Sequence, residues 1–425
     1  MDTNEPVHTG TTVEVQLEAK PTDWEISPGH VVAGYGFNGQ VPGPTIEARV
    51  GDTLVVQLKN SLPEPTTIHW HGLRVPANMD GTEMTQHPVE PGASFEYRFR
   101  LPDAATFWYH PHINETEQME RGLYGALVVR SLAEPDLDRE RVLIFDDLKL
   151  DRKGNIAKFG GLIQRSKGRT GQIRLTNGKT GPEFEMSAGQ VERWRVLNAS
   201  SARYVRLSIG DRPFTILGTD GGLIPAPVTV RDAILAPAER LDLAVGPFSE
   251  GENIAVDSLP YDRGHHIEQE GGHYATVRVG PSAPSRAKIP EVLRHIDPLV
   301  TGQVTPNRTV PLGVKMSLRR GVYWTVEGEV HHQGDPVRVG ELQVWDVVNE
   351  TVMDHPFHLH GFFFQVLEVN GEPPPALSWK DTINVPQKGR ARIAWLPDDR
   401  PGSWMYHCHI LEHHAAGMMA MFDVE

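Results

Sequence analysis

The strongest constraint on the fold of this chain is a ten-residue strand pattern that occurs three times. Each copy begins at a glycine, continues with alternating strand residues and reaches an asparagine nine positions later. The copies occupy residues 51–60, 189–198 and 340–349, so they begin 138 and 151 residues apart. Because a spacing of this size corresponds to one domain, the pattern predicts three similar domains.

Short alternating segments between glycines and prolines predict that each domain is built from β-strands. The clearest candidate strands span residues 13–17, 53–58, 95–101, 126–130 and 141–146, and a further segment recurs at 122–130, 272–279 and 417–424. Long segments with a helical period are scarce, so we expect an all-β sandwich or barrel class. Expected linkers near 131–138 and 280–290 divide the chain into domains at 1–131, 132–283 and 284–425.

Four histidine motifs occur in matching order in the first and third repeats. The first repeat has His-x-His-Gly and then Tyr-His-x-His, with 39 positions from His71 to His110. The third repeat has the same two motifs, with 47 positions from His360 to His407. The middle repeat lacks them. The two pairs of motifs supply eight imidazoles: His69, His71, His110, His112, His358, His360, His407 and His409.

The spacing within these motifs indicates a metal site between the first and third domains. Residues i and i+2 of a strand point to the same side, so each His-x-His aims two imidazoles in one direction. One isolated His-x-His is more often a partly exposed pair, but two matched copies of two motifs make coincidence negligible. Neutral imidazole is a good ligand for copper, and eight such groups suit several copper ions.

A second pattern surrounds the only cysteine of the chain. Blue-copper sites use two histidines, a cysteine thiolate and a weak axial methionine. Cys408, His413 and Met418 follow one another at five-residue spacing, and His355 supplies the second imidazole from an earlier segment. Two details stay open, because His414 could replace His413, and Met419 or Met421 could replace Met418.

The position of Cys408 between two histidines suggests a route for electrons. The middle residue of a strand tripeptide points opposite to its neighbours. The Cys408 thiolate can therefore bind one copper ion while His407 and His409 face another centre. The covalent connection between the two centres is then short.

Composition excludes several other classes of function. The formal net charge of −14 argues against a nucleic-acid or anionic-membrane partner. No run approaches the roughly 18 apolar residues of a membrane span. A single cysteine excludes an intrachain disulfide and a zinc site built on several thiolates. Residues 1–8 lack the apolar core of a signal peptide, so we expect either a cytoplasmic protein or one whose export signal is absent from this sequence.

With these motifs, nearly the whole chain resembles the multicopper oxidases, and within them the three-domain bacterial laccases. The resemblance implies three cupredoxin-like Greek-key β-sandwich domains, a trinuclear copper cluster between the first and last, and a middle domain that connects them without holding copper. It implies four copper ions in three classes of site. The type 1 ligands would be His355, Cys408, His413 and Met418; the type 2 ligands His69 and His358; and the type 3 ligands His71, His110, His112, His360, His407 and His409.

The resemblance also implies the reaction. Reducing substrates each lose one electron at the type 1 copper, and dioxygen accepts four electrons at the cluster and becomes water. Because this reaction consumes protons, an acid is expected near the cluster, and Asp80 is the candidate, although a turn residue in Asp80-Gly81 is an equally good interpretation. Asp381 resembles a family segment near the type 1 site, where it could accept a proton or hydrogen bond from a phenol.

The substrate class is predicted from two features. An axial methionine implies a lower type 1 potential and therefore easily oxidised phenols and aromatic amines. Relatives that oxidise Cu(I) carry a methionine-rich insert, which this chain with 11 methionines does not show. Laccase-like activity is favoured, and cuprous oxidation in copper tolerance is the alternative.

Other functions fit the motifs less well. A copper nitrite reductase places its blue-copper ligands in the first of two domains, whereas Cys408 lies close to the last residue of this sequence. A structural cupredoxin-repeat protein would lack several ligands, and an electron carrier or copper store would leave eight histidines unexplained. We expect a monomer, and the resemblance favours a periplasmic or extracellular location, with the cytoplasm as the alternative.

Overall fold

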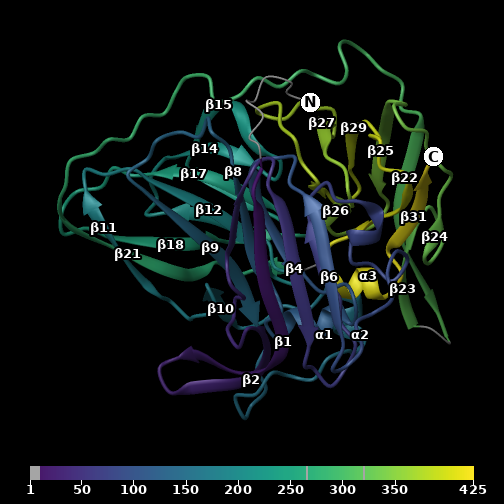
Figure 1. Ribbon diagram of the computed structural model, residues 1–425, viewed down its shortest axis with the longest axis horizontal. Coiled ribbons are helices and arrows are strands. Elements are labelled where there is room, and N and C mark those ends of the chain that lie inside the picture. The colour runs from purple at the N-terminus through teal and green to yellow at the C-terminus, as the bar shows by residue number, and fades with distance from the viewer. Residues whose placement is uncertain (1–9, 265–266, 319–320) are drawn as a thin grey trace.

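The chain forms three β-sandwiches that lie side by side in the computed structural model (Figure 1). The structure describes residues 10–264, 267–318 and 321–425. Residues 1–8, on which the expectation about export depends, lie outside the described residues. In Figure 1 the second sandwich lies on the left, the front sheet of the first in the centre and the third on the right. The all-β prediction is confirmed.

The first sandwich packs two four-stranded sheets around one apolar core. One sheet has the order β2-β1-β4-β6, with bounds His30–Phe37, Thr12–Ser27, Thr53–Asn60 and Ser94–Arg100. The other has the order β3-β8-β7-β5, with bounds Ile46–Arg49, Gly125–Arg130, Ala105–His110 and His69–His71.

The second sandwich has a six-stranded and a five-stranded sheet around its own core. The larger sheet has the order β10-β9-β12-β17-β14-β15, with bounds Ile173–Thr176, Arg139–Leu148, Glu192–Asn198, Arg240–Val245, Phe214–Thr219 and Gly222–Val230. The smaller has the order β11-β21-β18-β13-β16, with bounds Glu183–Ala188, Gly272–Ser282, Asn253–Leu259, Val205–Ile209 and Asp232–Leu235. A small extra ribbon joins β19 and β20, Tyr261–Asp262 and Glu268–Gln269.

The third sandwich packs two five-stranded sheets around a third core. The order β23-β22-β25-β29-β27 has bounds Gly321–Val326, Arg308–Ser317, Gln343–Asn349, Arg390–Trp395 and Phe364–Val369. The order β24-β31-β30-β26-β28 has bounds His332–Gln333, Met419–Val424, Gly402–Cys408, His355–Leu359 and Thr382–Val385.

Helices are few and short. They are α1, α2, α3 and the 3-10 turn η1, with bounds Glu115–Glu120, Leu162–Lys167, Leu411–Ala415 and Ala77–Met79. Helix α3 contacts both α1 and α2, so one helix from each sandwich meets at this place. None of the helices in the described part of the chain has the length and hydropathy needed to span a bilayer.

The repeated asparagine does the same work in each sandwich. Asn60, Asn198 and Asn349 are all buried at the ends of β4, β12 and β25. Each side-chain amide donates to two backbone carbonyls and accepts from the backbone N–H two residues later, at 2.7–3.1 Å. These strands also have matching neighbours, because each pairs in parallel with β1, β9 or β22. The repeated sequence pattern therefore corresponds to a strand that ends in the same way in each sandwich, at a buried asparagine bonded to the backbone.

Candidate metal centre

The end of β30, the start of β26 and helix α3 bring one thiol and two imidazoles together inside the third sandwich. Cys408 Sγ lies 3.4 Å from His355 Nδ1 and 3.8 Å from His413 Nδ1, and the two Nδ1 atoms are 3.2 Å apart. All three side chains are fully buried. Thr351 Oγ1 lies 2.8 Å from His355 Nε2, so that ring nitrogen is occupied and Nδ1 is left to face the thiol.

Buried residues surround this group of one thiol and two imidazoles. Burial raises the pKa of the Cys408 thiol to about 12, so a thiolate forms there only together with a bound cation. Met418 is buried and joined to this loop through its backbone, because Met418 N–H donates to His413 O and Cys408 N–H to Met418 O. The indole of Trp324 packs on the His413 ring at a centroid distance of 3.9 Å.

The other eight predicted histidines converge at the boundary between the first and third sandwiches. Four come from β5, β7 and the residues after β7, and four come from β26, β30 and the residues after them. All are buried. The two groups interleave, because His71 stacks on His358 at 3.8 Å and His69 stacks on His360 at 4.0 Å between ring centroids.

Backbone carbonyls fix which nitrogen of several rings points into this cluster. A carbonyl can only accept, so each imidazole donates from the nitrogen that touches it. His69 Nδ1 and His358 Nδ1 lie 2.8 Å from the carbonyl oxygens of Asp80 and Asp381. The Nδ1 atoms of His110 and His407 contact the carbonyls of the residues that follow them, at 3.0 and 2.9 Å. The Nε2 atoms of all four rings are thereby directed away from these carbonyls as bare acceptors.

The inward nitrogens lack proton donors, which fits a bound cation. His69 Nε2, His112 Nε2 and His358 Nε2 are buried without a hydrogen-bond partner. His360 Nε2 and His407 Nε2 face each other at 3.0 Å, although the other nitrogen of each ring already donates outward. Facing lone pairs repel unless a metal ion lies between them, so the donor set fits copper.

Burial also keeps these rings in the form that binds metal. Desolvation, followed by the effect of neighbouring histidines, lowers the pKa values of His110, His112, His360, His407 and His409 well below the ordinary range. The rings are therefore neutral at neutral pH, and neutral imidazole is the metal ligand.

Asp80 lies directly behind the cluster, in the turn that follows η1. Its Oδ2 atom accepts from His360 Nδ1 at 2.8 Å, and its Oδ1 atom lies 3.3 Å from His69 Nδ1 without a hydrogen bond. The carboxylate is 1% exposed, so it belongs to the site rather than to a surface turn. Its proposed role in proton supply stays a prediction.

The expected location of Asp381 is wrong. The sequence interpretation placed it near the type 1 site, but Asp381 Oδ1 lies 3.1 Å from His71 Nε2, on the side of the eight histidines. The reason is the pairing of β26 with β28, in which His358 faces Thr382 and His355 faces Val385 at the other end. Asp381 precedes β28 and therefore sits at the cluster end of that pair.

The sequence analysis did not predict two contacts beside the cluster. His414 packs on His407 at 4.3 Å between ring centroids, and its Nδ1 atom contacts the buried carboxylate of Glu115 in α1. Arg240, from the second sandwich, forms two hydrogen bonds with Asp381. Glu115 follows His112 by three positions, a spacing that could have drawn attention to it. Arg240 stands in none of the motifs, so nothing in the sequence pointed to it.

Comparison with known proteins shows the family of the chain. Multicopper oxidase family models match residues 18–134, 149–252 and 307–425. The multicopper oxidase MmcO of Mycobacterium tuberculosis is 30% identical, over 98% of this chain and 88% of the relative. The laccase of Bacillus subtilis is 28% identical, over 92% of this chain and 90% of the relative.

A solved structure gives the same result for the fold. The multicopper oxidase of Campylobacter jejuni, described as a metallo-oxidase, superimposes with a TM-score of 0.85 at 30% identity, over 97% of this chain and 91% of that one. The chain belongs to the multicopper oxidase family and is an oxidoreductase that binds copper. The predicted cupredoxin-like fold class is confirmed.

Proposed function

We propose that this chain is a laccase-like multicopper oxidase, which couples one-electron oxidation of phenols and aromatic amines to four-electron reduction of dioxygen to water. The observation that carries the proposal is the pair of buried donor sets joined through three consecutive residues. Cys408 Sγ faces His355 at 3.4 Å, whereas His407 Nε2 faces His360 at 3.0 Å. Such adjacency gives electrons a short covalent path between the centres.

The proposal assigns four copper ions to these donors. His355, Cys408, His413 and Met418 would hold a type 1 ion; His69 and His358 a type 2 ion; and His71, His110, His112, His360, His407 and His409 a type 3 pair. Bound copper would supply the one-electron redox chemistry. The partnerless Nε2 atoms of His69 and His358 support the type 2 assignment.

A cavity beside α3 supports an organic substrate. Its volume of 490 Å³ lies within the range of small-molecule sites. Apolar and aromatic side chains of Phe159, Leu162, Ala415 and Ala416 line it together with the carboxylate-bearing Glu412, which precedes His413. An aromatic ring would pack on the apolar walls, while Glu412 would accept a hydrogen bond from its hydroxyl or amine group.

We propose Asp80 as the acid that supplies protons for dioxygen reduction. Its Oδ1 atom has no hydrogen-bond partner and is turned toward the His69 side of the cluster. General acids contribute about 10²–10⁴-fold to rates when they stand within reach of the reacting group. Asp381 does not share this role in the proposal, because Arg240 holds both of its oxygens.

Oxidation of Cu(I) is the second candidate. The relative from Campylobacter jejuni is described as a metallo-oxidase. In addition, His413 is fully buried under Trp324, so an organic substrate would deliver its electron without touching the ring. A metal ion could instead be held by the Glu412 carboxylate in the cavity beside α3.

The domain limits and the location complete the proposal. We propose domains at 1–131, 132–283 and 284–425, supported by the end of β8 at Arg130 and of β21 at Ser282. A monomer outside the cytoplasm is proposed from the resemblance to bacterial laccases.

The decisive experiment measures dioxygen uptake by the copper-loaded protein with a methoxyphenol and with Cu(I) in one assay. We expect faster uptake with the phenol, water as the product and a blue thiolate-to-copper absorption band. Cys408→Ser should abolish the band and the uptake. Stoichiometric hydrogen peroxide would refute the four-electron reaction, and faster uptake with Cu(I) would favour the metal oxidase.

A further inference from the structure

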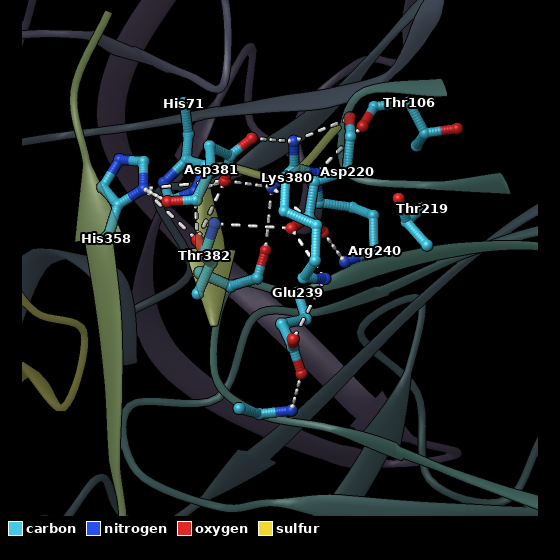
Figure 2. A network of polar contacts seen from close by, with 12 residues as sticks. His71, Thr106, Thr219, Asp220, Glu239, Arg240, His358, Lys380, Asp381 and Thr382 are labelled. Carbon is cyan, nitrogen blue, oxygen red and sulfur yellow. Dashed lines mark hydrogen bonds and ion pairs between the residues drawn. The ribbon is translucent and has the colours of Figure 1, made fainter. Parts of the chain in front are cut away.

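The second sandwich contributes none of the predicted copper ligands, yet one of its side chains reaches the Asp381 carboxylate, which contacts two of them. Arg240 begins β17 and is fully buried. Its guanidinium donates to Asp381 Oδ1 at 2.7 Å and Oδ2 at 2.5 Å, an arrangement that holds the carboxylate at two points. Figure 2 shows this pair beside His71 and His358.

Arg240 is held in place from all three sandwiches. Within its own sandwich it donates to the carbonyls of Ala238 and Asp220, at 3.2 and 3.1 Å. Its Nε atom donates at 3.0 Å to the carbonyl of Thr106 in β7, the strand that ends at His110. The carboxylate that it clamps belongs to the third sandwich. The Arg240 guanidinium thus connects the second sandwich to the first and the third, which supply the histidines of the cluster.

Asp381, held by Arg240, contacts two histidines of the cluster and so fixes their orientation. Its Oδ1 atom lies 3.1 Å from His71 Nε2, and its carbonyl oxygen lies 2.8 Å from His358 Nδ1. The Asp381 carboxylate, whose two oxygens both accept from Arg240, also accepts the proton of His71 Nε2. This leaves His71 Nδ1 facing His110 Nε2, 3.5 Å away.

The backbone of the first histidine motif makes room for the clamp. Gly72 has a positive φ of +84°, and a Cβ built there would clash with the Arg240 guanidinium and with Asp381 Oδ2. The matching Gly361 of the third repeat accommodates the ring of Trp404 instead. The glycine of the His-x-His-Gly motif therefore leaves space for an aromatic ring in the third sandwich and for the Arg240–Asp381 pair in the first.

We propose that Arg240 is a positioning residue for the trinuclear copper cluster, which acts by fixing Asp381 and through it the metal-facing nitrogens of His71 and His358. This inference rests on the proposed copper sites and gives the second sandwich a function in the reaction. A partner that orients a ligand typically affects metal affinity by about 10–100-fold.

The test compares Arg240→Met and Arg240→Lys with the wild-type protein after copper loading. The wild type is measured first, and a copper content below four per chain would contradict the proposed function rather than the role of Arg240. For Arg240→Met we expect a 10–100-fold faster loss of cluster copper to a chelator and an altered type 2 electron paramagnetic resonance signal. The blue band of Cys408 should persist.

Arg240→Lys covers the case in which the methionine variant does not fold. An ammonium keeps the charge but cannot hold both oxygens of Asp381, so we expect copper loss and a type 2 signal between those of wild type and the methionine variant. Unchanged copper retention and an unchanged signal in the lysine variant would overturn the proposal.

Arg195→Met is the matched control. Arg195 is equally buried in the adjacent strand β12 and also contacts Thr106, at 3.2 Å, but its ionic partners are Glu134, Glu140 and Asp242. Its loss should weaken the contact between sandwiches without changing the type 2 signal. Equal copper loss in the Arg195 and Arg240 variants would show that docking of the sandwiches alone is responsible and would overturn the proposal.

Discussion

Asp80 and Asp381 occupy equivalent places in the two halves of the cluster but have different counterions. Each backbone carbonyl oxygen accepts from the first histidine of the His-x-His-Gly motif in its own sandwich at 2.8 Å, and each carboxylate contacts a histidine of the opposite sandwich. Asp381 is clamped by Arg240, whereas the ionic partners found for Asp80 in the described part of the chain are only histidines. The two aspartates thus have similar hydrogen bonds to histidines, but only Asp381 also forms an ion pair with an arginine.

This difference shows what the second sandwich adds. Two similar outer sandwiches would produce a cluster with similar acids on both sides. Arg240 changes one side only, because it pairs with Asp381 and not with Asp80. Next to this pair, Lys380 of the third sandwich binds Asp220 and Glu239 of the second, at 3.0 and 3.1 Å (Figure 2). The asymmetry of the cluster therefore arises where the second sandwich docks on the third.

The largest expected effect comes from removing the clamped carboxylate. Asp381→Ala leaves the buried Arg240 without its bidentate partner, and breaking a buried ion pair in this way costs about 3–5 kcal/mol. Asp80→Ala removes only a hydrogen-bond acceptor, for about 1–3 kcal/mol. Urea unfolding of the two metal-free variants measures the difference, and equal losses would break the comparison.

The next effect concerns the rate of dioxygen reduction. Asp80→Asn keeps the size of the side chain but removes its acid, so we expect kcat for dioxygen uptake to fall by about 100-fold at full copper content. Asp381→Asn should instead lower copper retention, with a smaller fall in kcat per bound copper than Asp80→Asn. Rapid-quench or oxygen-electrode rates, normalised to bound copper, separate the two, and an equal fall in kcat would contradict separate roles.

The two motif glycines give a smaller and more selective effect. Gly72→Ala and Gly361→Ala both place a methyl group in occupied space, for about 1–3 kcal/mol of lost stability. Only the methyl at residue 72 meets the Arg240–Asp381 pair, so only Gly72→Ala should also weaken retention of cluster copper. Thermal melting and copper counts on the same samples test this, and a matching copper loss in Gly361→Ala would argue against it.

Salt should have the smallest effect. Arg240 and Asp381 are both buried, and buried ion pairs are screened far less than exposed ones. We therefore expect the stability difference between metal-free wild type and Arg240→Met to change by less than about 0.5 kcal/mol between low and moderate salt. A larger change in urea midpoints would mean that water reaches the pair.

Much of the fold was predictable because each sandwich is specified by local patterns. The alternating segments at 13–17, 53–58, 126–130 and 141–146 lie in strands, and the segment at 95–101 does so up to Arg100, where β6 ends. The grouping of the histidines was also accessible, since strand periodicity and the matched motifs require it. The orientation of each ring was not, because it depends on carbonyls such as that of Asp381, whose position follows from the pairing of β26 with β28.

Contacts between sandwiches account for what the sequence could not provide. Arg240 lies 141 positions from Asp381, and neither stands in a pattern shared with the other. Glu115 and His414 are separated by 299 positions in the same way. Such pairs are fixed by how three finished sandwiches dock, which no local periodicity encodes.

The distribution of the donors has a consequence for how the molecule matures. Synthesis on a ribosome delivers His69 long before Cys408, so both candidate metal sites stay incomplete until the third sandwich has been synthesised. Copper would therefore be acquired only after the third sandwich has been made, and a chain that stops before β30 would lack the thiol of Cys408 and remain colourless.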